Sequence, residues 1–248
     1  MANFVLVHGA WHGAWCWRRV SEALVRAGHR AHAVTLTGVG ERAHLLSPSI
    51  TLETHIADVI AAIEAEEMTD VLLAVHSYAG MIGTAVADRM PGRLAHLVYV
   101  DAVVPESGES WSSTHASATR ESRLAAAAAS SSYSFPPPDP SVFGLQGEDH
   151  EWVKRRQTPH PGHTYQAPLD FDPGRVALVS RTFINCTDPP LATIDVIRAR
   201  VTDPKFWGGA WLAGSRVVTL ATGHDPMISA SVALTQCLLD CAGRGIPS

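Results

Sequence analysis

Short, unbroken apolar runs alternate along the chain with amphipathic stretches that are long enough to form helices. Strands without polar alternation are buried on both faces, so they belong in a parallel sheet that helices cover on both sides. The sequence therefore predicts an α/β fold with a mainly parallel, six-stranded sheet. The expected strands cover residues 4–7, 31–36, 71–75, 94–100, 181–186 and 216–220. The expected helices cover residues 15–27, 52–66, 78–90, 118–129, 149–156 and 228–241.

Charge and composition exclude several classes of function. The 248 residues carry a net charge of −5 without a run of Lys or Arg, which argues against nucleic acid and anionic membranes as partners. No apolar run approaches the roughly 20 residues of a membrane span. No basic segment precedes a long apolar stretch near Met1, so we expect no secretory signal and a cytoplasmic location. The four cysteines form no C-x-x-C pair, and we expect packing thiols rather than a metal site.

Residues 105–175 interrupt the regular alternation. We interpret them as a cap inserted into a core made of residues 1–104 and 176–248. The segment is too rich in aromatic side chains for a plain linker. These side chains are Trp111, Tyr133, Phe135, Phe143, Trp152 and Tyr165.

Ser77 stands directly after the strand VLLAV and directly before an expected helix. A nucleophilic serine on a strand-to-helix elbow requires this context, and its usual signature is G-x-S-x-G. The outer positions are Val75 and Ala79 here, so the signature is incomplete. A helix N-cap serine is the alternative, and these residues alone leave both interpretations open.

The loop His8-Gly9-Ala10 follows the first expected strand. In serine hydrolases of α/β type, one oxyanion donor is a backbone N–H in this loop, and the other belongs to the residue after the nucleophile. The donors would be the N–H groups of Ala10 and Tyr78. The alternative is an ordinary glycine-containing turn between a strand and a helix.

A serine nucleophile needs a histidine base and a carboxylate that fixes its tautomer, in the order Ser, acid, His on this type of fold. His224 follows the last expected strand, and Asp188 follows the strand before it. We therefore predict Asp188 as the acid and His224 as the base. Asp101 also ends a strand and is the chief rival acid. Weaker rivals are Asp195, Asp203 and Asp225.

The motifs FVLVHGAWHGAWCW, LTGVGERAH, HSYAG, CTDPP and TGHDPM together resemble the α/β-hydrolase superfamily, and more narrowly its methylesterase and hydroxynitrile-lyase branch. The likeness covers residues 3–104 and 176–241. In the cap, RRQTPHP and TYQAPL resemble small bacterial esterases of that branch, which act on pyrethroid esters and on the methyl carbamate carbendazim. Among these bacterial esterases, the chain resembles the carbendazim-hydrolysing type in particular.

This resemblance implies that Ser77 is the nucleophile, Asp188 the acid and His224 the base, with oxyanion donors at Ala10 and Tyr78. Val75 and Ala79 depart from the glycines usual in the family. Lyases of the branch carry threonine at the position of Gly9 and lysine at the position of Asp225. A carboxylate beside a departing cyanide would repel it, so hydrolysis is favoured over cyanohydrin cleavage.

We therefore expect a serine esterase that cleaves an ester or carbamate of a small aromatic substrate through an acyl- or carbamoyl-enzyme, without a metal or cofactor. A general carboxylesterase or methylesterase is the main alternative, ahead of a hydroxynitrile lyase or a binding protein without turnover. The sequence leaves the oligomeric state open. The candidate pocket residues, each of which is also explained by packing alone, are Trp11, Trp111, Phe135, Trp152 and Tyr78.

Overall fold

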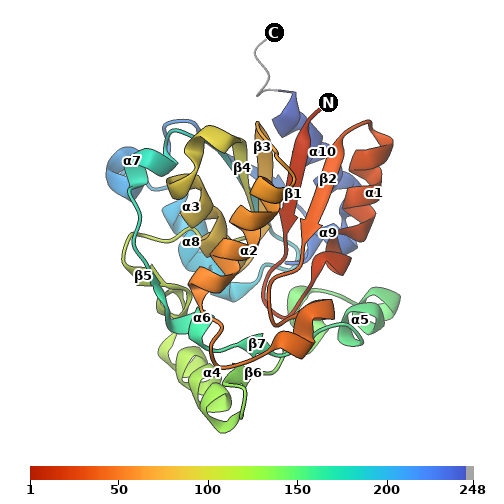
Figure 1. Cartoon of the computed structure of the whole chain (residues 1–248), viewed down its shortest axis with the longest axis vertical. Helices are drawn as coiled ribbons and strands as arrows, with labels where there is room; N and C mark the ends of the chain where they lie inside the picture. Colours follow the sequence, from red (N-terminus) through yellow and green to blue (C-terminus); the bar gives the residue numbers. More distant parts are fainter. Residues whose placement is uncertain (244–248) are drawn as a thin grey trace.

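A six-stranded sheet forms the centre of the protein, whose computed structural model describes residues 1–243 (Figure 1). Its strand order is β10-β9-β4-β3-β1-β2, and every neighbouring pair is parallel. The predicted parallel sheet is therefore confirmed. The strands are β1 (Asn3–Val7), β2 (Arg30–Val34), β3 (Val71–His76), β4 (Leu94–Val100), β9 (Ser180–Cys186) and β10 (Ser215–Leu220).

Helices cover both faces of this sheet. Two of them, α1 (Arg18–Arg26) and α10 (Ser231–Ala242), pack together on one face, while α2 (Leu52–Ala65) and α3 (Ala79–Arg89) pack together on the other (Figure 1). The central strand β3 is buried along its whole length. Its unbroken apolar sequence therefore reflects contact with helices from both sides.

Several element boundaries differ from the prediction. The first expected helix begins with a 3₁₀ turn at Ala14–Trp17 before α1, and the expected strand at 31–36 ends at Val34. The closing helix is divided into α9 (Pro226–Ser229) and α10 because Ala230 leaves the helical conformation. A further helix, α8 (Asp195–Arg200), lies between β9 and β10 in the sequence.

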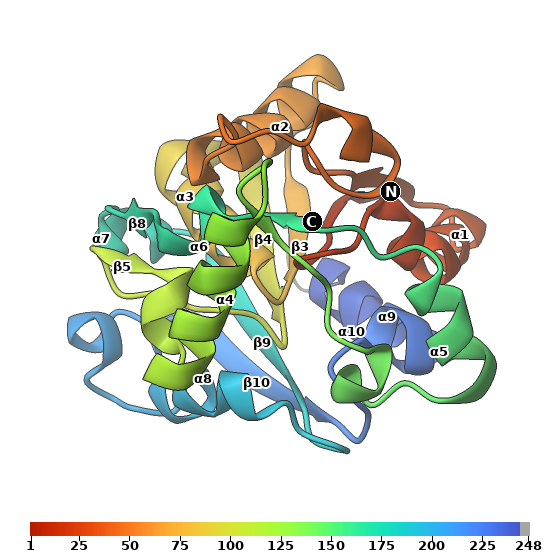
Figure 2. The same ribbon diagram turned by 90° about the horizontal axis from the view of Figure 1, so that it is seen from below.

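The segment that we predicted as a cap lies against the carboxyl ends of the strands (Figures 1 and 2). It contains two short antiparallel pairs, β5 with β8 and β6 with β7. Its elements are β5 (Glu109–Ser110), α4 (Ser117–Ala129), β6 (Ser134–Phe135), α5 (Gly147–Lys154), β7 (His160–Pro161), α6 (His163–Gln166) and β8 (Pro168–Leu169), and α7 (Pro173–Val176) leads back to the sheet. The division into core and cap domains stays a prediction.

Candidate active site at the carboxyl edge of the sheet

Ser77 lies on a sharp turn between β3 and α3 and adopts a φ of +54°. A left-handed conformation is uncommon for a residue with a side chain and is strained unless neighbouring structure holds it. Here the Ser77 N–H donates to Val100 O at 3.3 Å, and the Val103 N–H donates to Ser77 O at 3.0 Å. Ser77 is also partly exposed, whereas its neighbours His76 and Tyr78 are buried. The turn therefore has the backbone expected of a nucleophile elbow.

Glycines on α3 make room for the side chains that depart from the elbow signature. A Cβ atom added at Gly83 would lie 2.8 Å from a methyl carbon of Val75, so Val75 fits because Gly83 has no side chain. A Cβ atom at Gly80 would lie 1.8 Å from Val103 O. Because Gly80 has no side chain, α3 can lie close to the chain that follows β4. The tight turn therefore forms with Val75 and Ala79 in place of the usual glycines.

His224 joins Ser77 to a carboxylate, which belongs to Asp101. The His224 Nδ1 atom lies 2.7 Å from Asp101 Oδ2, and its Nε2 atom lies 2.9 Å from Ser77 Oγ. A carboxylate accepts hydrogen bonds, so Nδ1 carries the proton and Nε2 is free to accept from the serine hydroxyl. This arrangement orients His224 to remove a proton from Ser77.

Asp101 is fully buried, and its charge is compensated. Arg198 on α8 donates through Nη2 to Asp101 Oδ1 at 3.0 Å and to Oδ2 at 3.3 Å. The Cys186 N–H donates to Oδ1 at 3.3 Å. These donors leave Oδ2 available to His224 while they offset the cost of burying a carboxylate. No sequence motif marks Arg198, so it was not predicted as a site residue.

The prediction that Asp188 contacts His224 is wrong. Asp188 is exposed. Its backbone N–H donates to Thr222 O at 2.9 Å, which ties the segment after β9 to the segment after β10. Within residues 1–243, its carboxylate accepts no hydrogen bond from His224. Asp101 has a φ of +42° instead, and this conformation directs its side chain inward at the end of β4.

The backbone N–H groups of Ala10 and Tyr78 donate no hydrogen bond inside the described part of the chain, as expected for oxyanion donors. The peptide that contains the Ala10 N–H is held by His8, whose Nδ1–H donates to Gly9 O at 2.7 Å. The Leu36 N–H donates to His8 Nε2 at 3.1 Å, which fixes this neutral tautomer. Burial lowers the pKa of His8 to about 3, so the ring stays uncharged.

Gly9 allows this loop to approach the elbow. A Cβ atom at Gly9 would lie 2.7 Å from Ser77 Cβ and 2.8 Å from His76 Nδ1. Any larger residue would push the loop away from Ser77. The close approach therefore explains why glycine precedes Ala10.

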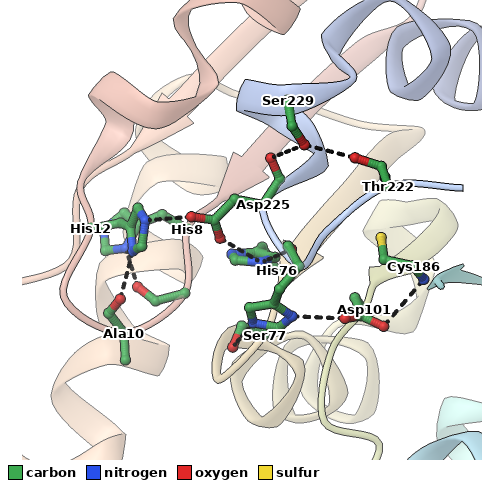
Figure 3. A network of polar contacts seen from close by, with 12 residues as sticks. His8, Ala10, His12, His76, Ser77, Asp101, Cys186, Thr222, Asp225 and Ser229 are labelled. Carbon is green, nitrogen blue, oxygen red and sulfur yellow. Dashed lines mark hydrogen bonds and ion pairs between the residues drawn. The ribbon is translucent and has the colours of Figure 1, made fainter. Parts of the chain in front are cut away.

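A second buried charge network connects the loop that contains Ala10 with Asp225, the residue after His224 (Figure 3). His12 Nδ1 lies 2.7 Å from Ala10 O, and His12 Nε2 lies 3.1 Å from Asp225 Oδ2. Both partners are acceptors, so both ring nitrogens of His12 carry protons and the ring is a cation. Burial opposes this charge, but Asp225 outweighs burial and raises the pKa of His12. Burial likewise works to raise the pKa of Asp225, yet His12 lowers it to about 2.

His76 connects the second network to His224. Its Nε2–H donates to His224 O at 2.9 Å, and the same nitrogen lies 3.5 Å from Asp225 Oδ1. Burial lowers the pKa of His76, so the ring is neutral. His76 therefore supports the backbone of His224 rather than acting on Ser77.

We expect Asp225→Ala to lower the free energy of unfolding by about 3–5 kcal/mol at pH 7, because it leaves the His12 cation buried without its partner. Because the pKa of His12 is raised, its contribution to the free energy of unfolding is complete below pH 6.5. This contribution is lost as pH rises through the raised pKa. Because the pKa of Asp225 is lowered, its contribution to the free energy of unfolding is lost as pH falls toward about 2. Urea denaturation across about pH 2–9 covers the titration of both groups and measures both effects.

Asp225→Asn is the matched control for this prediction. Its amide can donate to the Nε2 atom of a neutral His12, so we expect a smaller loss of stability. It should also remove the decline in stability that His12 causes at alkaline pH in the unmodified protein. A loss below about 1 kcal/mol in Asp225→Ala would show that the pair is not the stabilising contact described here.

Three of the predicted pocket tryptophan and phenylalanine residues gather above the elbow. Trp11 lies 5.8 Å from Phe135 and 6.1 Å from Trp111 between ring centroids, and Trp111 lies 4.9 Å from Tyr78. The sequence analysis did not assign Phe143 to the site, although its ring lies 5.6 Å from His224. Phe143 was visible only as one aromatic residue of the cap.

Trp152 does not join this group. On α5 its ring lies 5.0 Å from Trp15 and 4.7 Å from the guanidinium of Arg156. It lines a separate depression with Arg19 and Asp149. The assignment of Trp152 to the pocket is wrong because α5 packs beside the first helix, away from the elbow (Figure 2).

His76, His224 and Asp225 bring ligand atoms within 4.8 Å of one another, so metal binding has to be considered. Both ring nitrogens of His224 already contact Ser77 and Asp101, and Asp225 contacts His12. A metal would have to break these contacts. The expectation that no cofactor is required stays a prediction. Among residues 1–243, no helix combines the length and the apolar character that crossing a bilayer requires.

Comparison with known proteins identifies the family. The family model described as "Alpha/beta hydrolase family" matches residues 4–235. The carbendazim hydrolyzing esterase of Nocardioides sp. (strain SG-4G) is 42% identical over 92% of this chain and 94% of its own. Methylesterase 7 of Arabidopsis thaliana is 27% identical over 81% of this chain and 84% of its own. The resemblance to esterases of this branch, including the carbendazim-hydrolysing type, is therefore confirmed.

Solved structures agree at the level of the fold. An extracellular α/β-hydrolase from a Paenibacillus species has a TM-score of 0.76 with 18% identity and covers 100% of both chains. The methylesterase MES16 from Arabidopsis has a TM-score of 0.71 with 20% identity and covers 98% of this chain and 99% of its own. By its fold and its matched sequence, this chain belongs to the alpha/beta hydrolase family.

Proposed function

We propose that this protein, a hydrolase of ester bonds by its family and relatives, cleaves the ester or carbamate bond of a small aromatic substrate through a covalent acyl- or carbamoyl-enzyme. The observation that carries the proposal is the connected series Ser77–His224–Asp101, with contacts of 2.9 and 2.7 Å. Asp101 replaces Asp188 as the proposed acid. We also propose that residues 105–175 act as a cap that encloses the substrate.

The proposed reaction has two stages. His224 Nε2 takes the proton from Ser77 Oγ as the serine oxygen bonds to the substrate carbonyl carbon, and the N–H groups of Ala10 and Tyr78 stabilise the oxyanion. The tetrahedral intermediate then expels the alcohol, which receives the proton from His224. Water loses a proton to His224, attacks the acyl or carbamoyl carbon, and releases Ser77 with its proton restored.

The neighbouring groups favour the charge changes in this mechanism. Asp101 stabilises the imidazolium that forms at His224 and holds the ring in the required tautomer. Arg198 compensates the buried negative charge of Asp101 through two contacts, at 3.0 and 3.3 Å. His8 donates to the carbonyl of the peptide that bears the Ala10 N–H, which strengthens that N–H as a donor.

A methyl carbamate such as carbendazim is the proposed substrate type. A relative that is 42% identical is named a carbendazim hydrolyzing esterase. The aromatic group of Trp11, Trp111 and Phe135 favours a flat ring. A carbamate carbonyl is deactivated by its nitrogen, so it requires the complete set of oxyanion donors.

A general methylesterase is the second candidate, because Methylesterase 7 of Arabidopsis thaliana also resembles this chain. Cyanohydrin cleavage has less support. The sequence argument that Asp225 would repel cyanide no longer holds, because its carboxylate is fully buried and paired with His12. However, this position holds Asp225, so it offers no lysine to hold a cyano group.

Incubation of the purified full-length chain with methyl N-aryl carbamates and methyl aryl esters tests the proposal. We expect methanol release from both substrate types, and covalent labelling at Ser77 by a sulfonyl fluoride, located by mass spectrometry. Methanol from esters alone would favour the general methylesterase. Labelling at another residue in an active preparation would contradict the serine mechanism, and ligand binding without any turnover would favour a binding protein.

A further inference from the structure

A half-buried cation on α4 lies among the rings of the aromatic group. The guanidinium carbon of Arg123 lies 5.1 Å from the ring centroid of Trp111, 5.2 Å from Trp11 and 5.4 Å from Tyr165. A fourth ring, Phe135, lies at 5.9 Å. Figure 2 shows α4 crossing the carboxyl edge of the sheet, where Ser77 also lies.

Arg123 has few polar partners. Its Nη1 donates to His115 Nδ1 at 3.3 Å, and no carboxylate in residues 1–243 lies within 4 Å of its guanidinium. An arginine carries five N–H donors and no acceptor. Burial lowers the pKa of Arg123, and Tyr165 acts in the opposite direction through its charge and a side-chain hydrogen bond. Arg123 therefore retains donors that the protein itself does not use.

The side chain of Arg123 borders a partly open pocket. Arg123 lines a pocket of about 250 Å³ together with Trp11, Phe135 and Pro136–Pro138. Trp11 is 4% exposed, and its indole Nε1–H has no hydrogen-bond partner in the described chain. An indole N–H, like a guanidinium, can only donate. The free N–H groups of Arg123, and the indole N–H of Trp11 in the same lining, indicate a ligand that supplies acceptors.

The pocket is also close to the candidate active site. Trp11 directly follows Ala10, whose N–H is a proposed oxyanion donor. The Trp11 ring lies 6.1 Å from Phe143, which in turn lies 5.6 Å from His224. A substrate with its carbonyl at Ala10 would therefore extend its ring along Trp11 toward Arg123.

We propose that Arg123 and the Trp11 indole N–H select aromatic substrates that carry a hydrogen-bond acceptor, such as a ring nitrogen or a carboxylate, on the part of the ring remote from the scissile bond. The inference rests on the proposed function and narrows its substrate class. The flat face of such a ring packs against the aromatic side chains, while an acceptor in the ring plane meets the N–H groups. Rings that carry only hydrogen-bond donors or a positive charge are disfavoured.

Matched substrates test this selectivity. Methyl isonicotinate and monomethyl terephthalate carry the acceptor, and methyl benzoate lacks it. We expect Arg123→Met to lower kcat/KM for the acceptor-bearing esters by about 10–100-fold more than for methyl benzoate, because a hydrogen bond to a charged group is lost. Comparing variants through this ratio cancels the different chemical reactivities of the esters.

Three further variants separate recognition from packing. Arg123→Lys keeps the charge without the planar fork, so it should retain part of the selectivity. Trp11→Phe keeps a ring without the N–H and should reduce selectivity by a smaller factor. Arg120→Met is the control on the same helix and should leave selectivity unchanged. An equal loss for all substrates in Arg123→Met would overturn the proposal in favour of a packing role.

A binding measurement keeps this test independent of turnover. Isonicotinamide differs from benzamide only by a ring nitrogen in place of a CH group. Calorimetry should show tighter binding of isonicotinamide to the unmodified protein, and Arg123→Met should remove the preference. Equal binding of both amides would refute the proposal even if esters are hydrolysed. If no ester is hydrolysed but the preference depends on Arg123, the proposed function fails and the recognition site stands.

Discussion

Ser77→Ala is expected to lower kcat by about 10⁴-fold or more, because alanine cannot form the covalent intermediate that we propose at Ser77. The hydroxyl lies 2.9 Å from His224 Nε2 on a turn whose left-handed backbone presents it at the carboxyl edge of the sheet. Removing one oxygen atom leaves the backbone donors at Ala10 and Tyr78 in place. Substrate binding should therefore change much less than turnover.

Steady-state kinetics with a methyl ester measure this loss. Ser113→Ala, at an exposed position of the cap segment, is the matched control and should behave like the unmodified protein. An activity above about 1% in Ser77→Ala would contradict a serine nucleophile, since losses in enzymes of this kind are far larger. Retention of the thermal transition in both variants excludes unfolding as the cause.

Asp101→Asn is expected to lower kcat by about 10³–10⁴-fold. An amide at this position can donate to His224 Nδ1 and so favours the tautomer that leaves Nε2 protonated and unable to accept from Ser77. Asp188→Asn is the matched control and should change kcat by less than about twofold, because Asp188 is exposed and does not contact His224. The two variants make the same chemical change at two strand ends.

Stability has to be measured beside activity for this pair. Asp101→Asn removes one of the two carboxylates that pair with Arg198, the other being Asp195 at 2.7 Å, and this loss costs stability as well as catalysis. Rates are therefore compared per folded protein, with the folded fraction taken from circular dichroism at the assay temperature. A greater loss of kcat in Asp188→Asn than in Asp101→Asn would overturn the assignment of the acid.

Local sequence determines the scaffold and two members of the candidate site. The unbroken apolar runs specify the buried parallel strands, since each must be covered on both faces. Ser77 is identified because a strand, a tight turn and a helix follow one another within a few residues. His224 is identified because it follows the last strand, and parallel strands place their carboxyl ends along one edge of the sheet.

Tertiary structure alone decides between Asp101 and Asp188. Both residues follow strands that end at this edge, so chain order and spacing cannot separate them. The choice depends on the direction in which each side chain leaves its strand. Asp101 turns inward at a φ of +42° and meets Arg198, which is 97 residues away in sequence, whereas the backbone contact of Asp188 with Thr222 leaves its side chain in solvent.

The pocket depends on long-range packing in the same way. Trp11 and Trp152 look alike in the sequence, but α5 carries Trp152 to the first helix, while Trp11 remains beside Ala10. Arg123 carries no sequence signal, because a charged residue on an amphipathic helix is ordinarily exposed. The sequence by itself determined the sheet, the elbow and the histidine through local periodicity. The fold decided the acid and the pocket cation, because burial and charge compensation arise only when distant segments pack together.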